Sequence, residues 1–457
     1  MFKKKDEFIW GVSSSAFQTE GAVSVDGKGP SIWDHFTEKK KRAARKETAV
    51  HASQFYARYV DDISLMKEMN IPNFRFSIAW SRIFPAGTGI VNRKGVDFYK
   101  RLIDACLENG ITPWVTLYHW DLPLLLEYRG GWANRDILDW FNEYVDRCIT
   151  EFGDKVKNWM VLNEPVVFTG AGYFLGVHAP GRRGLNNFLP AVHYAALCQA
   201  AGISMIKERL PDANVGTTFS CSHLQSFSDS EKDIAALKRV DALLNRLFVE
   251  PLLGLGYPFQ SLPSLRKIEK YFKCGDTDKL KAPFDFIGLQ HYTREVVRHS
   301  KWTPVINAQL VPAHERKVFR TVMNWEVYPD GMYEVIKKFS AYENVNNIII
   351  TENGAAFEDI LTDGQINDKA RLQYLQNYIS QVEKARSEGY PVKGYFVWSF
   401  TDNFEWSEGY HPRFGLVHID YKTYKRTIKK SGAWYATFLK RQSTAEFKSS
   451  SNSDILV

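Results

Sequence analysis

Cysteine is scarce in this chain, and it does not occur in the patterns that bind metal ions. The five cysteines among its 457 residues are far apart and form neither a Cys-x-x-Cys pair nor a cluster with histidine. They are Cys106, Cys148, Cys198, Cys221 and Cys274. The first two fall on the apolar faces of predicted helices, which favours buried free thiols over disulfides. We therefore expect no metal site and a location in the reducing cytoplasm.

Membrane-spanning runs and nucleic-acid-binding motifs are also missing. No hydrophobic run is long enough to span a membrane, and residues 1–7 lack the apolar core of a signal peptide. The net charge is +7, and the densest basic stretch, residues 39–46, has the composition of a solvated loop. No motif that binds RNA or DNA accompanies it. We expect neither a membrane nor a nucleic acid as a partner.

Segments typical of strands and of helices alternate along the chain. Eight short segments have the apolar composition of parallel strands buried on both faces. They cover residues 8–13, 73–78, 113–118, 159–163, 214–219, 284–290, 347–351 and 393–399. Amphipathic stripes with helical spacing lie between them, at 96–106, 137–149 and 372–382. This alternation predicts an α/β fold, a single (β/α)8 TIM barrel with elaborated βα loops, over residues 1–441.

The rest of the sequence favours neither a second fold class nor a second domain. A doubly wound open sheet would also alternate strands and helices, but no G-x-G-x-x-G follows the first strand. No internal repeat or linker divides the chain. The end of the chain, residues 442–457, is polar and rich in serine, and we predict a disordered tail there.

Two glutamates each follow an apolar segment of this barrel pattern. Glu164 follows the run 159–163, and Glu352 follows the run 348–351. An α/β barrel carries its chemistry at the carboxyl ends of its strands, so we expect the two carboxyls at one pocket. Such a pair is the minimum equipment for cleaving a glycosidic bond. Taken alone, each glutamate could also be a charged residue that ends a strand before a turn.

The segments around both glutamates resemble the active-site segments of glycoside hydrolase family 1, the β-glucosidase family. Further segments are similar to that family in the same order along the chain, at residues 8–22, 74–82, 116–123 and 398–415. The resemblance implies a retaining β-glycosidase that hydrolyses terminal β-D-glucosides by double displacement, with side activity on β-galactosides and β-fucosides. It implies small-molecule β-glucosides or short oligosaccharides as substrates and no cofactor, because two carboxyls supply acid, base and nucleophile.

The resemblance also assigns catalytic roles. It makes Glu164 the general acid/base, with a pKa raised by burial and by the second carboxylate. It makes Glu352 the nucleophile, which must stay ionised to attack the anomeric carbon. Arg75 and Tyr292 are implied to hold Glu352 and to lower its pKa. Retention further implies that the two carboxyls lie about 5 Å apart.

A second group of residues is implied to bind the substrate. The positions that match the sugar contacts of the family are Gln18, His119, Trp120, Asn163, Trp398, Glu405, Trp406 and Phe414. Asn163 is expected to bond the sugar 2-hydroxyl. Trp325 is expected to stack on the leaving group, and Phe168, Tyr173 and Phe174 are candidates for the same side.

Three residues argue against two other functions, and a fourth departs from the family. Glu405 argues against a phospho-β-glycosidase, because a carboxylate there would repel a 6-phosphate. The presence of both Glu164 and Glu352 argues against a binding or receptor module that keeps the barrel but has lost catalysis. One position departs from the family: Gln290 stands where asparagine is usual. We therefore expect the support of the catalytic carboxyls to differ here.

Overall fold

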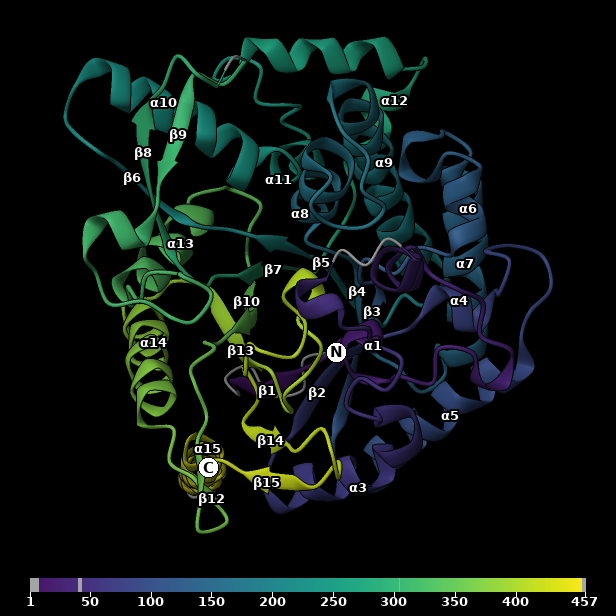
Figure 1. Cartoon of the computed structure of the whole chain (residues 1–457), viewed down its shortest axis with the longest axis vertical. Coiled ribbons are helices and arrows are strands. Elements are labelled where there is room, and N and C mark those ends of the chain that lie inside the picture. Colours follow the sequence, from purple (N-terminus) through teal and green to yellow (C-terminus); the bar gives the residue numbers. More distant parts are fainter. Residues whose placement is uncertain (1–7, 40–42, 304, 454–457) are drawn as a thin grey trace.

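The chain folds as a closed barrel of parallel strands surrounded by helices (Figure 1). The computed structural model describes residues 8–39, 43–303 and 305–453. The barrel strands are β1 (Ile9–Ser13), β2 (Asn73–Ser77), β3 (Thr112–Tyr118), β4 (Asn158–Asn163), β5 (Asn214–Ser220), β7 (Phe286–Gln290), β10 (Ile348–Asn353) and β13 (Val392–Trp398). All eight predicted strands are present, with each predicted end within two residues of the observed one. The predicted (β/α)8 barrel is confirmed.

Strand order and interior packing explain why the chemistry is confined to one end of the barrel. The closed order is β1-β13-β10-β7-β5-β4-β3-β2, so strands that follow each other along the chain are also neighbours in space. Large side chains from six strands fill a layer of the interior, namely Ile9, Trp114, Met160, Phe286, Ile349 and Phe396. The barrel centre is therefore packed core rather than a channel, and space for a ligand remains at the carboxyl ends of the strands.

Amphipathic helices cover the outside of the barrel (Figure 1). The longer ones are α3 (Phe55–Glu68), α5 (Arg93–Glu108), α7 (Ile137–Phe152), α9 (Leu185–Arg209), α10 (Glu231–Asp241), α13 (Asp330–Ser340), α14 (Lys369–Ser387) and α15 (Lys430–Ser453). The predicted stripes lie on α5, α7 and α14, and Cys106 and Cys148 are buried on α5 and α7 as free thiols. Short helices occupy the loops: α1 (Ala16–Thr19), α2 (Ile32–Asp34), α4 (Trp80–Ile83), α6 (Leu124–Tyr128), α8 (Pro165–Thr169), α11 (Val249–Leu253) and α12 (Asp276–Lys279).

Helix α9 is long and apolar enough to cross a membrane by length and composition alone. Its position explains this composition, because 83% of its most apolar stretch is buried inside the fold. It packs against α7 and against the strands β4 and β5. An apolar surface on nearly all sides is what a helix enclosed in a large core requires.

Three small sheets extend the loops beyond the barrel. The largest joins β6 (His223–Ser226), β8 (Arg294–His299) and β9 (Ala308–Val311), and it lies with α10 to one side of the barrel (Figure 1). Because β6 follows β5 and β8 follows β7, this sheet begins at the carboxyl ends of two barrel strands. The others are the pairs β11 (Leu361–Thr362) with β12 (Gln365–Ile366) and β14 (Val417–Ile419) with β15 (Arg426–Ile428).

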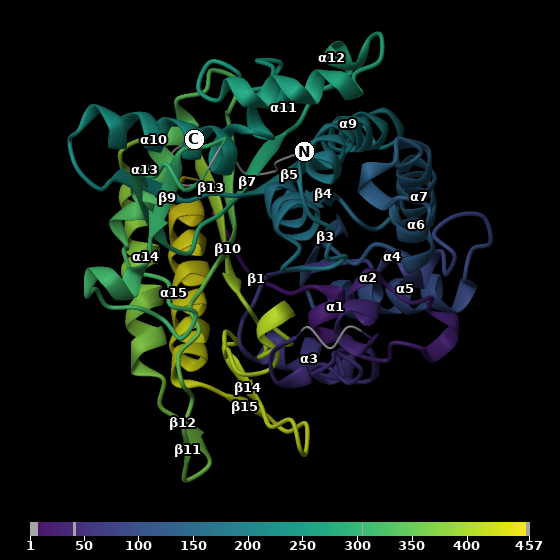
Figure 2. The ribbon, with the colours of Figure 1, turned by 45° about the horizontal axis from the view of Figure 1, so that its top comes forward.

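The backbone of α15 is helical as far as Ser453, and the disordered tail predicted for residues 442–457 stays a prediction. The first half of α15 lies beside α14 (Figure 2) and is anchored by Tyr435, which donates a hydrogen bond to the Gly11 carbonyl at 3.0 Å. Extending a helix that already exists avoids the cost of nucleation, so a polar sequence can continue it. Residues 454–457 lie outside the described residues, as do 1–7 and, in the basic stretch, 40–42. Arg45 and Lys46 of that stretch are exposed.

Candidate active site

One cavity of about 280 Å³ lies at the carboxyl ends of the barrel strands. Its wall includes eleven of the residues singled out from the sequence, namely Gln18, His119, Trp120, Glu164, Tyr292, Trp325, Glu352, Trp398, Glu405, Trp406 and Phe414. The loops and strand ends that carry them are spread from the start of the chain almost to its end. Arg75 and Asn163 are fully buried and lie behind the wall, where they contact residues that form it.

Glu352 is held firmly by its neighbours. Arg75 forms an ion pair with one carboxyl oxygen through Nη1, and the Tyr292 hydroxyl donates to the other at 2.6 Å. Arg75 is itself fixed, because its Nε donates to Thr116 Oγ1 at 3.1 Å. Two donors on opposite oxygens orient the carboxylate and favour its charged form. The predicted contacts of Arg75 and Tyr292 are therefore present.

The predicted effect on the pKa of Glu352 is only partly right. Burial raises this pKa above its usual value, while Arg75 and Tyr292 act in the opposite direction. The two contacts therefore offset a desolvation cost rather than produce a net lowering. The physical reason is that the site is dry: Glu352 is 3% exposed, and a charge in such surroundings has lost nearly all its hydration.

Glu164 is the second carboxyl of the pair, and its surroundings differ. Burial raises its pKa well above the usual value, and the charge of Glu352 raises it further, whereas Ser220 and Arg75 lower it. No ion pair reaches its carboxyl among the described residues. The pair therefore divides unequally, with Glu352 carrying the charge and Glu164 the proton.

Several residues of the pocket have unusual backbone conformations. Trp120, Glu164 and Trp406 have φ angles of 75°, 45° and 48°. A residue other than glycine reaches this left-handed region at a cost of order 1–3 kcal/mol, which the surrounding packing must offset. The Trp120 indole N–H, for example, donates to the Asn163 carbonyl at 2.9 Å. These side chains are therefore held in place rather than free to adjust.

Asn163 connects the two sides of the pocket from behind its wall. Its Oδ1 accepts hydrogen bonds from Arg75 Nη2 at 2.5 Å, Gln290 Nε2 at 2.7 Å and Thr218 Oγ1 at 3.0 Å. Its Nδ2 lies 3.0 Å from His119 Nε2. The oxygen is fully used by the protein, so only the second N–H of the amide remains for the expected bond to the sugar 2-hydroxyl.

His119 is neutral and has a nitrogen ready for substrate. Burial lowers its pKa well below the usual value, and the charge of Arg75 adds to this. Because Asn163 Nδ2 can only donate, His119 Nε2 accepts and the proton is on Nδ1. That Nδ1 is buried, belongs to a residue of the pocket wall and has no partner among the described residues of the protein. It is therefore a donor suited to a sugar hydroxyl.

Gln290 takes part in this arrangement in place of the usual asparagine. Besides its bond to Asn163, its Nε2 lies 3.3 Å from Thr218 Oγ1. Gln290 lines the pocket, and its buried Oε1 has no hydrogen-bond partner within the described part of the chain. The longer side chain therefore supports Asn163 with its amide nitrogen and presents an unsatisfied acceptor to the cavity.

Glu405 is another carboxyl of the pocket wall. Gln18 Nε2 donates to its Oε2 and to Asn403 Oδ1, both at 3.2 Å. Burial raises the pKa of Glu405 to about 8, with a further contribution from the charge of Glu352. The expected repulsion of a 6-phosphate cannot then rest on a charged Glu405 alone. A broader reason replaces it: the described wall contains five glutamates but no lysine or arginine to neutralise a phosphate.

Aromatic rings close the pocket on the remaining sides. Trp398 stacks with His119 at a centroid distance of 6.0 Å, and it is the predicted floor. Trp325 packs near Tyr292 and Phe414, at 5.2 and 6.1 Å. Their faces are the apolar surfaces on which sugar rings stack.

The prediction that aromatic residues of the segment after Glu164 line the leaving-group side of the pocket is wrong. Phe168 is buried against Tyr118 and Trp132, and the hydroxyl of Tyr173 donates to Glu127 at 2.6 Å. Phe174 packs on Phe188 and is partly exposed. None of the three is in the described wall, which takes Val167 from this segment instead. Helix α8 turns Phe168 into the core, and the helical segment Gly170–Leu175 that follows does the same for Tyr173.

Several polar residues of the pocket wall were missed by sequence reasoning. They include Ser220, Ser222, Thr293 and Glu295. Ser220 ends β5, so its position at the end of a predicted strand could have revealed it. Glu295 lies on β8 of the additional sheet, and nothing in the sequence pattern marks it.

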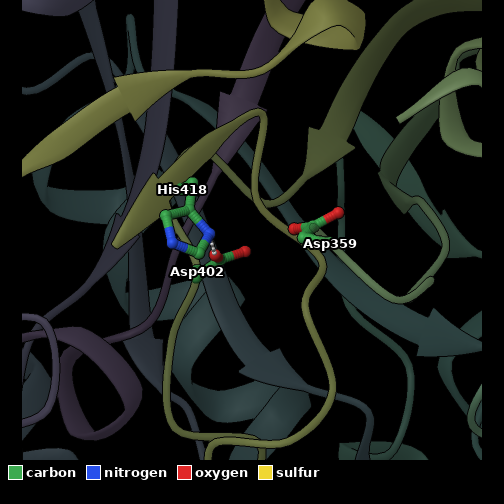
Figure 3. A group of neighbouring side chains, drawn as sticks. All are labelled: Asp359, Asp402 and His418. Carbon is green, nitrogen blue, oxygen red and sulfur yellow. Dashed lines mark ion pairs between the residues drawn. The ribbon is translucent and has the colours of Figure 1, made fainter. Parts of the chain in front are cut away.

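A separate acidic cluster beneath the sugar-binding loops is an ion-pair network. Asp359, Asp402 and His418 lie close enough together to share a metal ion by geometry alone (Figure 3). Their oxygens, however, are already paired with cations. Lys429 Nζ is 2.6 Å from Asp402 and also pairs with Asp359, and Arg371 pairs with Asp359 at 3.0 Å. A metal ion would have to displace these buried cations.

This network fixes the segment that carries Glu405, Trp406 and Phe414 of the pocket wall. Asp402 accepts hydrogen bonds from the backbone N–H groups of Gly415 at 3.0 Å and Ile419 at 3.3 Å. Burial alone would raise the pKa of Asp402, but Lys429 and other nearby cations hold it well below the usual range. The charged Asp402 thus ties together the two ends of the loop between Trp398 and β14.

Comparison with known proteins agrees with this geometry. The family model for glycosyl hydrolase family 1 matches residues 2–444. β-Glucosidase A of Thermotoga maritima is 42% identical over 96% of this chain and 98% of its own. β-Glucosidase A of Acetivibrio thermocellus is 42% identical over 95% and 97%.

Solved structures give the same result. The family 1 β-glucosidase from Thermotoga maritima superimposes with a TM-score of 0.93 at 41% identity, over 97% of this chain and 99% of that one. The same enzyme in complex with deoxynojirimycin gives a TM-score of 0.92 at 41% identity, with the same coverage. With its barrel, its paired carboxyls and these relatives, the chain belongs to glycosyl hydrolase family 1, a family of retaining glycosidases.

Proposed function

We propose that this protein hydrolyses terminal, non-reducing β-D-glucosyl residues, with Glu352 as nucleophile and Glu164 as acid/base. The observation that carries the assignment is the unequal environment of the two carboxyls in one pocket. Glu352 receives an ion pair and a hydrogen bond, whereas Glu164 is buried beside a negative charge with no cation bound to it. The β-glucosidase names of the relatives support the choice of sugar.

In the first step Glu352 attacks the anomeric carbon and the glycosidic bond breaks. Glu164 gives its proton to the leaving oxygen, so the alcohol departs neutral. As the charge of Glu352 is consumed in the new bond, the repulsion that raised the pKa of Glu164 falls. Glu164 is then a carboxylate of lower pKa, ready to act as a base.

In the second step Glu164 takes a proton from a water molecule, and that water attacks the anomeric carbon of the glycosyl-enzyme. The bond to Glu352 breaks and the sugar leaves with its original β configuration. His119 Nδ1 and the free amide N–H of Asn163 are placed as donors to sugar hydroxyls. Donors of this kind contribute most when their bonds strengthen in the transition state.

The test is turnover of 4-nitrophenyl β-D-glucoside by the purified protein, compared with its 6-phosphate and with the α-anomer. We expect hydrolysis of the first compound only, since the acidic wall offers no cation for a phosphate. Turnover of the 6-phosphate but not of the plain glucoside would replace the proposal with a phospho-β-glucosidase. Binding without turnover would replace it with a sugar-binding module.

We also propose a cytoplasmic location. The free thiols of Cys106, Cys148, Cys198, Cys221 and Cys274 support a reducing compartment. Cell fractionation with antibodies against the protein would test this, and recovery from the extracellular medium would contradict it.

A further inference from the structure

Glu295 is a carboxyl of the pocket for which the proposed mechanism has no use. It lies on β8, where it is paired in register with Leu224 of β6. It shares the pocket wall with Ser222, Thr293 and Trp325. It therefore belongs to the outer wall that the additional sheet builds, next to the tryptophan expected to meet the leaving group.

The cations near Glu295 are already engaged by another carboxylate. Glu326 accepts hydrogen bonds from Arg294 Nε at 3.0 Å and Nη2 at 2.5 Å, and it also pairs with Arg316. The side chain of Glu295 has neither a hydrogen bond nor an ion pair within the part of the chain that the structure describes. Glu295 thus lines the cavity without a paired cation among the residues that the structure describes.

The electrostatic state of Glu295 agrees with this geometry. Burial raises its pKa to about 7, with Arg316 acting to lower it and Glu326 to raise it. An engaged cation would oppose this rise, as Arg75 does for Glu352. Glu295 is therefore partly stripped of water and not compensated by the protein. A ligand group that donates a hydrogen bond to Glu295 would replace the water that this carboxyl has lost.

The chemistry of the wall favours a sugar as the leaving group. A pyranose offers an apolar face for Trp325 and hydroxyl donors around its edge for Glu295. An aryl or alkyl leaving group offers the apolar face alone, and an anionic one would be repelled. A cationic one is disfavoured because the charge of Arg316 acts on the same place.

We propose that Glu295 determines leaving-group specificity by accepting a hydrogen bond from a hydroxyl of a second sugar residue, so that β-linked gluco-oligosaccharides are preferred. This inference rests on the proposed β-glucosidase activity and adds the class of the leaving group to it.

The test measures kcat/KM for cellobiose, laminaribiose and 4-nitrophenyl β-D-glucoside with the native protein and two variants. Glu295→Ala removes the acceptor, and Glu295→Gln keeps the shape and one acceptor oxygen but loses the charge. Glu315→Ala is the matched control, because Glu315 is an exposed carboxyl of the neighbouring segment and is outside the described pocket wall. Melting temperatures of all variants show whether each is folded.

We expect Glu295→Ala to lower the ratio of kcat/KM for the better disaccharide to that for the nitrophenyl glucoside by about 10- to 100-fold, as for the loss of a hydrogen bond to a charged group. Glu295→Gln should lower it less, and the control should leave it unchanged. An unchanged ratio in Glu295→Ala, or an equal loss on all substrates, would overturn the proposal. If the native protein cleaves only the nitrophenyl glucoside, this inference fails while the proposed function stands. If it cleaves neither kind, the proposed function itself fails.

Discussion

Replacing Glu164 with alanine separates its role as an acid from its role in the structure of the pocket. In the native protein the carboxyl is protonated at neutral pH because burial and the charge of Glu352 raise its pKa. General acid catalysis of this kind contributes about 10²- to 10⁴-fold, or roughly 2.7–5.5 kcal/mol of the barrel site's transition-state stabilisation. That contribution is needed in full only when the leaving oxygen is a poor leaving group.

The size of the effect should therefore depend on the substrate. For an alkyl β-glucoside, we expect Glu164→Ala to lower kcat/KM by about 10²- to 10⁴-fold. For 2,4-dinitrophenyl β-glucoside, whose leaving group needs little protonation, we expect less than about tenfold in the first step. The second step still lacks its base, so the glycosyl-enzyme should accumulate and a burst of phenol should precede slow turnover.

Azide provides a control for the same variant. Truncation to alanine leaves space beside the anomeric carbon, and a small anionic nucleophile needs no base to react there. We expect added azide to raise kcat for the dinitrophenyl substrate and to yield β-glucosyl azide. Equal losses on both substrate kinds, or rescue that yields the α-azide, would refute the assignment of Glu164 as acid/base.

Three other predictions concern residues around the catalytic pair. Tyr292→Phe removes a hydrogen bond that lowers the pKa of Glu352. Because activity needs the ionised carboxylate, the acidic limb of the plot of kcat/KM against pH should move to higher pH by about 1–2 units. An acidic limb that does not move would contradict this role of Tyr292. Lys429→Met leaves Asp402 buried without its closest cation, so urea unfolding at pH 7 should show a free energy of unfolding lower by about 3–5 kcal/mol. This difference should shrink as the pH falls below about 4, because Asp402 then binds a proton in the unfolded chain as well. A difference under about 1 kcal/mol at pH 7 would be inconsistent with the network. Gln290→Asn shortens the side chain that supports the pocket from behind, and we expect kcat/KM to fall about 2- to 10-fold, with an increase counting against a supporting role.

The barrel could be predicted from the sequence because its signals are local. Each strand is a short apolar run, and three of the packed helices show a buried stripe, as α7 does with Ile137 and Cys148 among its buried residues. The full extent of α15 could not be predicted, because its backbone continues into residues 442–453 by extending a helix that is anchored earlier, at Tyr435. Its polar composition carries no trace of that anchor.

The meeting of Glu164 and Glu352 at one pocket could be predicted because each lies at the carboxyl end of a barrel strand within a recognisable segment. The environment of the two carboxyls could not be predicted from the sequence. The pKa of Glu352 depends on how far burial outweighs Arg75 and Tyr292, which is a property of the packed site. Glu295 was missed for a related reason: it reaches the pocket through the additional sheet, and the pairing of Arg316 with Glu326 decides its state.

The most direct test of the account is the anomeric form of the first glucose released. The purified protein would be mixed with 4-nitrophenyl β-D-glucoside and followed by proton NMR from the first minutes, before mutarotation mixes the anomers. Attack by Glu352 followed by attack of water on the same face predicts that β-glucose appears first and α-glucose only later. Initial release of α-glucose would contradict retention and, with it, the role of Glu352 as the nucleophile.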